Sequence, residues 1–146
     1  MRVEDILKTK DTRIITVRLR ETVETAAKLM KSENISALVV KDVCRTEGNV
    51  VMGMFSERDI ARALVNHGPS MLQMRVEQLM SKKLISCKPE DELRHVLHLM
   101  VSNNIRHLPV MAEHVLVGVI SVRDLIGLRL TELDEEAKTV EAQTAS

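Results

Sequence analysis

The sequence is a tandem duplication, and this repetition limits the possible folds more than any other feature of the chain. Shifted by 70 residues, the segment 12–40 aligns without a gap with the segment 82–110, and eight of the 29 aligned pairs are identical. A shift of 65 then aligns 50–65 with 115–130. The shift changes because the intervening loop is longer in the first copy, and loops tolerate such changes in length.

Each copy shows the same order of expected elements: a strand, a helix, two strands and a second helix. Apolar residues spaced by three and four positions mark one buried face of the first helix. They are Val23, Ala26, Ala27 and Met30 in the first copy and Leu93, Val96, Leu97 and Met100 in the second. The expected strands are 14–17, 37–40 and 50–55, and 84–87, 108–111 and 115–120; the variable loops are 41–49 and 111–114.

One copy has about 60 residues and a three-stranded sheet, which is too small for a stable core of its own. The sequence therefore predicts an α+β fold in which two β-α-β-β-α repeats, related by a pseudo-twofold axis, pack sheet to sheet. We expect the first repeat at 1–67, a linker at 68–75 and the second repeat at 76–130. The polar segment 131–146 is expected to be a disordered tail.

Composition excludes several classes of function. The 21 Lys and Arg residues balance 21 Asp and Glu residues, which argues against a nucleic-acid binder. Phe55 is the only aromatic residue, so aromatic cages and base-stacking platforms are excluded. No apolar run reaches the roughly 18–20 residues of a membrane span. Cys44 and Cys87 have no metal-binding or redox spacing, which indicates two free thiols and a cytoplasmic protein.

A Gly-x-x-Ser-x-x-Asp motif stands at the start of the second helix in both copies, at 53–59 and 118–124. One interpretation is a capping box, in which Ser and Asp satisfy backbone groups at the helix start. The other is a binding site, because a helix start favours an anion and an Asp held there can accept both hydroxyls of a ribose. The repetition of the motif, each time with an Arg two residues after the Ser, favours a site.

These paired repeats resemble a tandem pair of cystathionine-β-synthase domains, also called a CBS pair or Bateman module. The segments Ile105–Val110 and Ser86–Pro89 are also typical of that family, and the resemblance covers about residues 1–130. It implies that the chain binds an adenosine-containing ligand, such as AMP, ADP, ATP, NAD or S-adenosylmethionine, in clefts between the repeats. It also implies a role in regulation, with no catalytic cofactor.

The resemblance assigns roles residue by residue. It places the ribose on the carboxylates and their capping hydroxyls, at Asp59, Ser56, Asp124 and Ser121. It places the adenine beside the first strands and the start of the second strands, at Ile14, Ile15, Thr16, Ala37, Leu84, Ile85, Ser86, Leu108 and Pro109. It places phosphates on basic residues, at Arg58, Arg106, His107 and Arg123.

The two clefts are not expected to be equivalent. The second copy carries Arg106 and His107 before and in its second strand, where the first copy has Ser36 and Ala37. The sequence leaves open which cleft receives which basic residue. It also leaves open whether the second cleft is weaker or holds the other half of a larger ligand such as NAD.

Three further expectations complete the sequence analysis. His95 and His98 share a helix face but lack a carboxylate or cysteine partner in a ligand pattern, so we expect exposed residues and no metal site. No nucleophile has a convincing base, so no enzyme is expected. The expected partners are a small adenosine ligand, a second copy of the chain and an unidentified effector protein. Neither nucleic acid nor a membrane is expected as a partner. The alternative is a structural association module with vestigial clefts.

Overall fold

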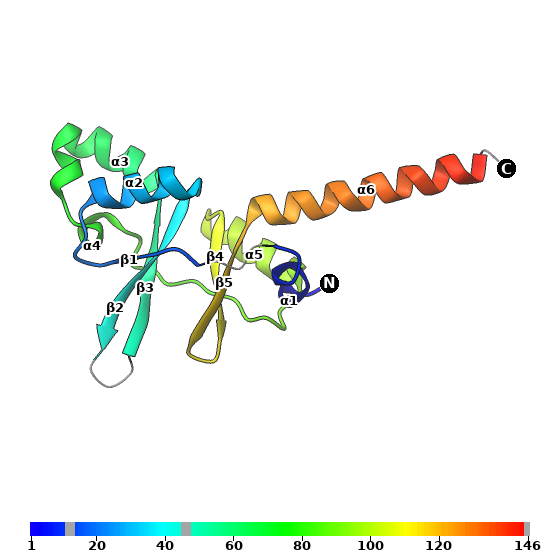
Figure 1. The fold of residues 1–146 in the computed structure, drawn as a ribbon, viewed down its shortest axis with the longest axis horizontal. Helices are drawn as coiled ribbons and strands as arrows, with labels where there is room; N and C mark the ends of the chain where they lie inside the picture. The colour runs from blue at the N-terminus through cyan, green and yellow to red at the C-terminus, as the bar shows by residue number, and fades with distance from the viewer. Residues whose placement is uncertain (11–13, 45–47, 145–146) are drawn as a thin grey trace. The chain divides into compact units, whose positions relative to one another are not determined.

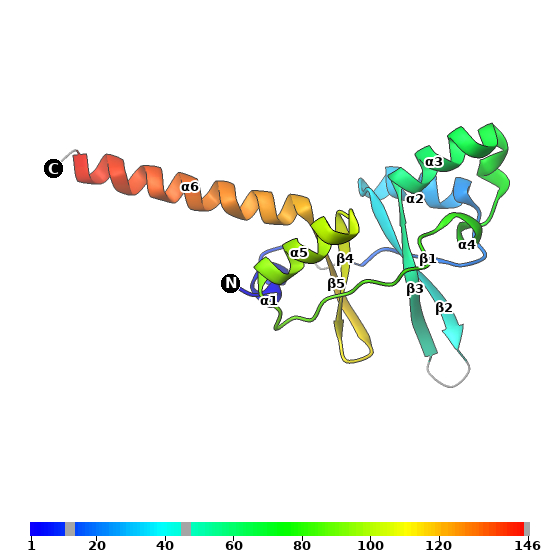
Figure 2. The same ribbon diagram turned by 180° about the vertical axis from the view of Figure 1, so that it is seen from behind.

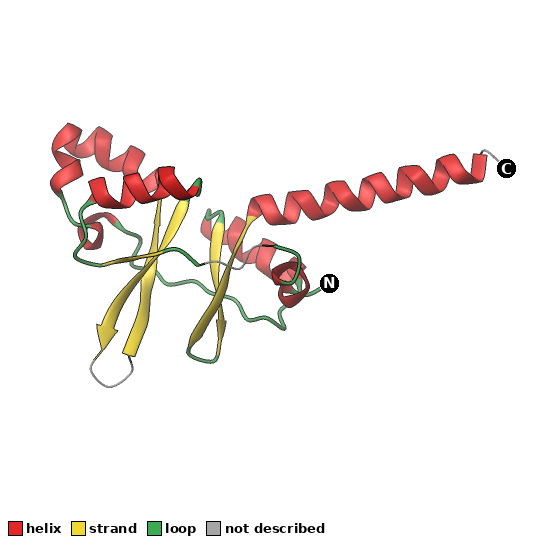
Figure 3. Cartoon of the chain, viewed as in Figure 1, coloured by secondary structure: helices red, strands yellow, loops and turns green. Residues whose placement is uncertain are grey.

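The computed structural model describes residues 1–10, 14–44 and 48–144, and the chain forms two compact units. One unit is Arg13–Ser86, and the other combines Met1–Thr12 with Cys87–Ser146. Figure 1 shows the course of the chain from its N-terminus (blue) to its C-terminus (red), and Figure 3 separates helices from strands. Each unit contains one copy of the repeat together with the short helix that precedes the other copy.

The unit Arg13–Ser86 contains a three-stranded sheet of order β1-β2-β3. β1 runs parallel to β2, and β2 runs antiparallel to β3. The helices α2 and α3 lie side by side and contact β2 and β3 respectively (Figures 1 and 2). The elements are β1 (Thr16–Arg18), α2 (Val23–Glu33), β2 (Ala37–Cys44), β3 (Gly48–Ser56), α3 (Glu57–His67), the 3-10 helix η1 (Gly68–Gln73) and α4 (Val76–Leu79).

The core of this unit forms because the helix period and the strand period point apolar side chains into one cluster. Strands contribute Val17, Leu38, Val40 and Phe55, and helices contribute Val23, Ala26, Met30, Ala63, Met71 and Val76. Phe55 and Leu38 are fully buried. Gly68, with φ 69°, ends α3, and Pro69 follows at the start of η1.

The second unit contains a two-stranded antiparallel sheet of β4 and β5. Its elements are α1 (Val3–Leu7), α5 (Leu93–Asn103), β4 (His107–Ala112), β5 (Val115–Ser121) and α6 (Val122–Thr144). α1 begins the chain but lies with α5 and β5 of the second copy, as both ribbon views show (Figures 1 and 2). The backbone N–H groups of Val3 and Glu4 donate to the carbonyls of Asp91 and Pro89, both at 2.9 Å.

The repetition predicted from the sequence is present in the backbone of both units. Asn34 and Asn104, an identical pair, each end a helix in the left-handed conformation, with φ 54° and 52°. The strand register shifts after Val40 in the first copy and after Val110, its counterpart, in the second. The predicted α+β fold class is therefore confirmed, and both copies show the same local backbone features.

Four local predictions were wrong. The segment 84–87 forms only an isolated parallel bridge from Cys87 to Val110, because no further residue pairs along it. The variable segment 41–49 is partly strand, since β2 continues to Cys44 and β3 starts at Gly48. Leu97 is 49% exposed, since α5 buries a narrower face around Val96 and Met100.

The fourth wrong prediction concerns the tail, because α6 continues to Thr144, well into the segment expected to be disordered. Nine of the 16 residues of this segment are Glu, Ala, Leu or Lys, which have high helix propensity. An ion pair between Arg129 and Glu132, at 3.2 Å, supports the helix near the start of this segment. Among the described helices, none combines the length and the apolar character needed to cross a bilayer.

Candidate functional site

In the first copy, Ser56 and Asp59 form a rigid polar pair where β3 becomes α3. Ser56 caps the helix, and its backbone N–H donates to Asp59 Oδ2 at 2.9 Å. Its hydroxyl donates to the same oxygen at 3.2 Å. Both residues are half-buried. The capping box thus exists, and it fixes the orientation of the Asp59 carboxylate through one of its two oxygens.

Strand pairing holds this pair beside the start of β2. Ala37 pairs with Ser56 across the strands, and the N–H of Glu57 donates to the carbonyl of Ser36 at 3.0 Å. The N–H of Val39 donates to the carbonyl of Ile15 at 3.4 Å, which ties the chain before β1 to the same strand. The structure therefore places Thr16, Ala37 and Ser56 in one sheet, with Ile15 just before β1 and Asp59 in the first turn of α3.

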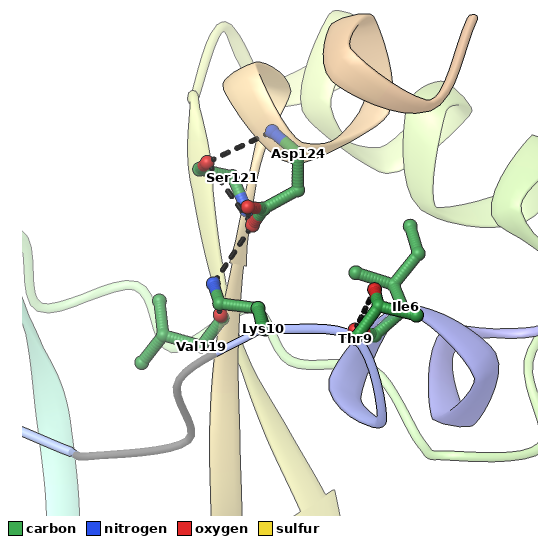
Figure 4. Close-up of polar contacts among 6 residues, drawn as sticks. All are labelled: Ile6, Thr9, Lys10, Val119, Ser121 and Asp124. Carbon is green, nitrogen blue, oxygen red and sulfur yellow. Dashed lines mark hydrogen bonds and ion pairs between the residues drawn. The ribbon is translucent and has the colours of Figure 1, made fainter. Parts of the chain in front are cut away.

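The second copy repeats this geometry around Ser121 and Asp124 (Figure 4). The backbone N–H and the hydroxyl of Ser121 donate to Asp124 Oδ2 at 2.8 and 3.1 Å, and the Asp124 N–H donates back to Ser121 Oγ at 3.3 Å. His107 pairs with Ser121 across the strands, and the N–H of Val122 donates to the carbonyl of Arg106 at 2.9 Å. Arg106 and His107 thus stand directly beside the helix start.

A lysine that the sequence analysis missed completes this arrangement. Lys10 Nζ lies 2.9 Å from Asp124 Oδ2 and also donates to the carbonyl of Val119 at 2.8 Å (Figure 4). The side chains of Lys10 and Asp124 are only 30% and 20% exposed. The repeat gives no signal for Lys10, because the shift of 70 aligns Lys83 with Arg13 and Lys10 lies before the aligned segment.

The remaining predicted adenine residues differ in their placement. Leu108 and Pro109 are buried in β4, and Ile14 and Thr16 are half-buried beside β2. Leu84, Ile85 and Ser86 belong to the unit Arg13–Ser86, whereas Asp124 belongs to the other unit. The structure therefore does not bring these three residues together with the second Ser–Asp pair inside one unit.

Two of the four predicted phosphate residues lie at a helix start, and the other two lie at the start of the strand that pairs with β5. Arg58 and Arg123 occupy the second position of α3 and of α6, and Arg106 and His107 lie where β4 begins. Arg106 and Arg123 are exposed, and Arg58 and His107 are half-buried. A guanidinium near a helix start can pair with an anion held at that end of the helix.

Metal binding and thiol chemistry find little support in the geometry. His95 and His98 are exposed, as predicted, and no group of three possible metal ligands occurs within the described parts of the chain. Cys87 is 2% exposed. Burial, assisted by the negative charge of Asp91, raises the pKa of its thiol to about 12. This thiol is therefore protonated and unreactive at neutral pH.

Each Ser–Asp pair thus offers one fixed carboxylate at the N-terminus of a helix. Such a carboxylate accepts hydrogen bonds from neighbouring hydroxyls, and the helix start and nearby cations favour a negative group beside it. A ligand that joins a diol to an anionic group fits both requirements. The same residues cap the helix and have the chemistry of a diol acceptor.

Comparison with known proteins places the repeats in a family. The family model of the CBS domain matches residues 3–66 and 76–130. The chain is 33% identical over 124 residues to the CBS domain-containing protein CBSX3, mitochondrial, of Arabidopsis thaliana, covering 84% of this chain and 59% of that protein. This chain therefore spans less than two thirds of that relative.

Solved structures agree with this placement. The CBS-domain protein ATU1752 from Agrobacterium tumefaciens is similar, with a TM-score of 0.81 and 31% identity over 88% of this chain and 92% of that one. The CBS domain pair of protein MJ0100, in complex with 5'-methylthioadenosine and S-adenosyl-L-methionine, has a TM-score of 0.76 and 25% identity, covering 90% of this chain and 98% of that one. The chain therefore belongs to the CBS domain family and carries two copies of the domain, which form a CBS pair.

Proposed function

We propose that this CBS pair is a non-catalytic regulatory module that binds an adenosine-containing nucleotide. The observation that carries the proposal is the duplicated Ser–Asp pair, in which Ser56 and Ser121 each hold a carboxylate in one orientation. A carboxylate fixed in this way binds a vicinal diol without first losing side-chain freedom. The adenosine ligands of the MJ0100 complex, which carry the same ribose diol, support the proposal.

In this proposal Asp59 and Asp124 each hold the two ribose hydroxyls, and the residues of the first and second strands contact the adenine. In the first copy these are Ile14, Ile15, Thr16 and Ala37. In the second copy they are Leu84, Ile85, Ser86, Leu108 and Pro109. The absence of Trp and Tyr from the sequence means that aliphatic side chains and backbone groups must recognise the base.

The residues proposed to bind the phosphates differ between the two sites. Arg106 and His107 flank Ser121, whereas Ser36 and Ala37 flank Ser56. The second copy is therefore the better phosphate site, assisted by Arg123, and the first copy has Arg58. AMP, ADP, ATP and NAD are the proposed ligands because each joins a ribose diol to phosphate.

Binding would act by a population shift, since a ligand that contacts one arrangement of the repeats better than another favours that arrangement. A homodimer would transmit the change to an effector protein. Exposed apolar side chains on three helices support association: Leu64 and Val65 on α3, Leu97 and Val101 on α5, and Ile126 and Leu130 on α6. These side chains also favour the second candidate function, a structural association module, which needs no ligand.

The composition makes a direct test possible. Without Trp and Tyr the protein absorbs little near 280 nm, so a bound nucleotide is visible near 260 nm against a low background. The purified protein is denatured and any released compound is identified by mass spectrometry. The protein is then dialysed against AMP, ATP, NAD and S-adenosylmethionine in turn. Saturable binding of a phosphorylated ligand is the expected result, and no binding of any compound would leave only the association module.

Light scattering during size exclusion tests the dimer separately. We expect a mass twice the 16.5 kDa of the chain at tens of micromolar. A monomer at that concentration would remove the dimer from the proposal, but it would not affect nucleotide binding.

A further inference from the structure

Within the described segments, the ion pair between Lys10 and Asp124 has no counterpart at Asp59. The carboxylate of Asp59 receives the two donors of Ser56, and no Lys or Arg of the described segments is ion-paired with it. Asp124 receives the two equivalent donors of Ser121 and, in addition, the ammonium of Lys10. Three donors therefore converge on Asp124 Oδ2, which leaves that oxygen little capacity to accept another hydrogen bond.

Lys10 is held in this place by the segment that precedes it. Val3 and Ile6 of α1 are buried, and Leu7 packs against Gly118 of β5. The hydroxyl of Thr9 donates to the carbonyl of Ile6 at 2.9 Å and closes the end of the helix. The bond from Lys10 Nζ to the carbonyl of Val119 then directs the ammonium along β5 to the carboxylate. Lys10 is thus part of a built arrangement and not a loose surface lysine.

We infer that Lys10 makes the second-copy site selective for anionic ligands. The inference rests on the proposed function, since it assumes that Asp124 holds a ribose diol. A diol that binds both oxygens of Asp124 must displace the ammonium from Oδ2. A neutral nucleoside displaces the ammonium but carries no anionic group to replace Asp124. The half-buried Lys10 cation is then left without an ion-pair partner.

A nucleotide compensates for that loss. Its 5'-phosphate lies a few ångströms from the diol, within the reach of the flexible lysine stem, and offers the ammonium a new anionic partner. AMP therefore exchanges one ion pair for another, whereas adenosine and 5'-methylthioadenosine lose one. S-adenosylmethionine adds a sulfonium and an ammonium against a single carboxylate, so its net positive charge disfavours it further. Lys10 thereby sets the class of ligand at Asp124, and no described Lys or Arg is ion-paired with Asp59 to give the first-copy site the same selection.

The test isolates the second-copy site in the variant Asp59→Ala and compares adenosine with AMP by isothermal titration calorimetry. In this background we expect Lys10→Met, which keeps the apolar stem but removes the charge, to strengthen adenosine binding and to weaken AMP binding. The ratio of the two affinities falls by about tenfold, the usual value of one charged hydrogen bond. Lys10→Arg keeps a ratio close to that of the parent, and Lys8→Met, an exposed residue of the same segment, leaves it unchanged.

The outcomes separate the inference from the proposed function. If the parent binds AMP but Lys10→Met leaves the ratio unchanged, or weakens both compounds equally, the role of Lys10 is wrong and the nucleotide function stands. If Asp59→Ala abolishes all binding while the unmodified chain binds AMP, the second-copy site is not used and the inference fails alone. If neither protein binds any adenosine compound, both fail. Thermal unfolding of every variant confirms that it is folded.

Discussion

A Cβ atom added to Gly53 would lie 2.5 Å from the carbonyl oxygen of Ser81, because the segment after α4 passes directly over β3. The N–H of Ser81 donates to the carbonyl of Met54 at 3.3 Å and holds the two segments at this distance. The counterpart Gly118 faces a side chain instead, since its added Cβ would lie 2.7 Å from Leu7 Cδ2. The two equivalent glycines therefore differ in what surrounds them.

This difference predicts unequal effects of the same substitution. Gly53→Ala is expected to lower the free energy of unfolding by about 1–3 kcal/mol, because the backbone at Ser81 must move. Gly118→Ala costs less, because the flexible side chain of Leu7 can change its rotamer. Urea denaturation of both variants measures the difference. An equal loss of unfolding free energy in the two variants would show that the close approach of Ser81 to Gly53 does not add to the destabilisation.

The buried thiol of Cys87 predicts slow alkylation. Burial, with a smaller contribution from Asp91, raises its pKa from 9.0 to about 12. At pH 8 the folded protein then holds about a thousandfold less thiolate than the unfolded chain. In the variant Cys44→Ser, iodoacetamide should label Cys87 only as fast as the protein unfolds. Labelling at the rate of a free peptide thiol would contradict the buried environment.

The same shift predicts that stability falls at high pH. The folded-state pKa is above the unfolded value, so the unfolded state loses its proton first and is favoured as the pH rises from about 9 towards 12. The contribution is fully present below pH 9, and about 1 kcal/mol is lost between pH 9 and 10. Urea midpoints over this range measure it. Cys87→Ala should lose less stability over the same range, and identical slopes in the two proteins would refute the assignment.

Because the C-terminal half of α6 is exposed, we expect its removal to leave the stability of the protein almost unchanged. Residues 133–143 are all exposed, so their removal takes no side chain from the core. A chain that ends at Glu132, which keeps the pair with Arg129, should change the free energy of unfolding by less than about 0.5 kcal/mol. The helical circular-dichroism signal at 222 nm should fall. An unchanged signal would support the disordered tail, and a large loss of stability would reveal packing on another surface.

The repeat itself explains why most of the fold could be predicted from the sequence. Two copies show the same apolar spacing and the same Ser–Asp motif, so each expected element is supported twice. Val23, Ala26 and Met30 are buried as their spacing predicts. The capping geometry at Ser56 and Ser121 could also be predicted from the sequence, because the capping box depends only on neighbouring residues.

Two of the errors share a cause, which is dependence on contacts between distant segments. Lys10 reaches Asp124 only because α1 packs on the second copy, a contact 114 residues apart in sequence. Leu97 has the right spacing for burial, but the packing around α5 decides how wide the buried face is. The helical tail was missed for another reason: its polar composition suits both a disordered segment and an exposed helix with good propensity.

The central claim is that Asp59 and Asp124 bind the ribose of a nucleotide. The most direct measurement is calorimetric titration of AMP into the unmodified chain and into the double variant Asp59→Ala and Asp124→Ala. Asp5→Ala serves as a control, since this carboxylate is exposed and accepts a hydrogen bond from the Arg2 N–H at the start of α1.

The account predicts saturable binding of AMP to the unmodified chain and to Asp5→Ala, with at least a hundredfold weaker binding to a folded double variant, since two charged hydrogen bonds per site are lost. Binding that is unchanged in the double variant would contradict the ribose assignment. A chain that binds no adenosine nucleotide at all would contradict the regulatory function itself.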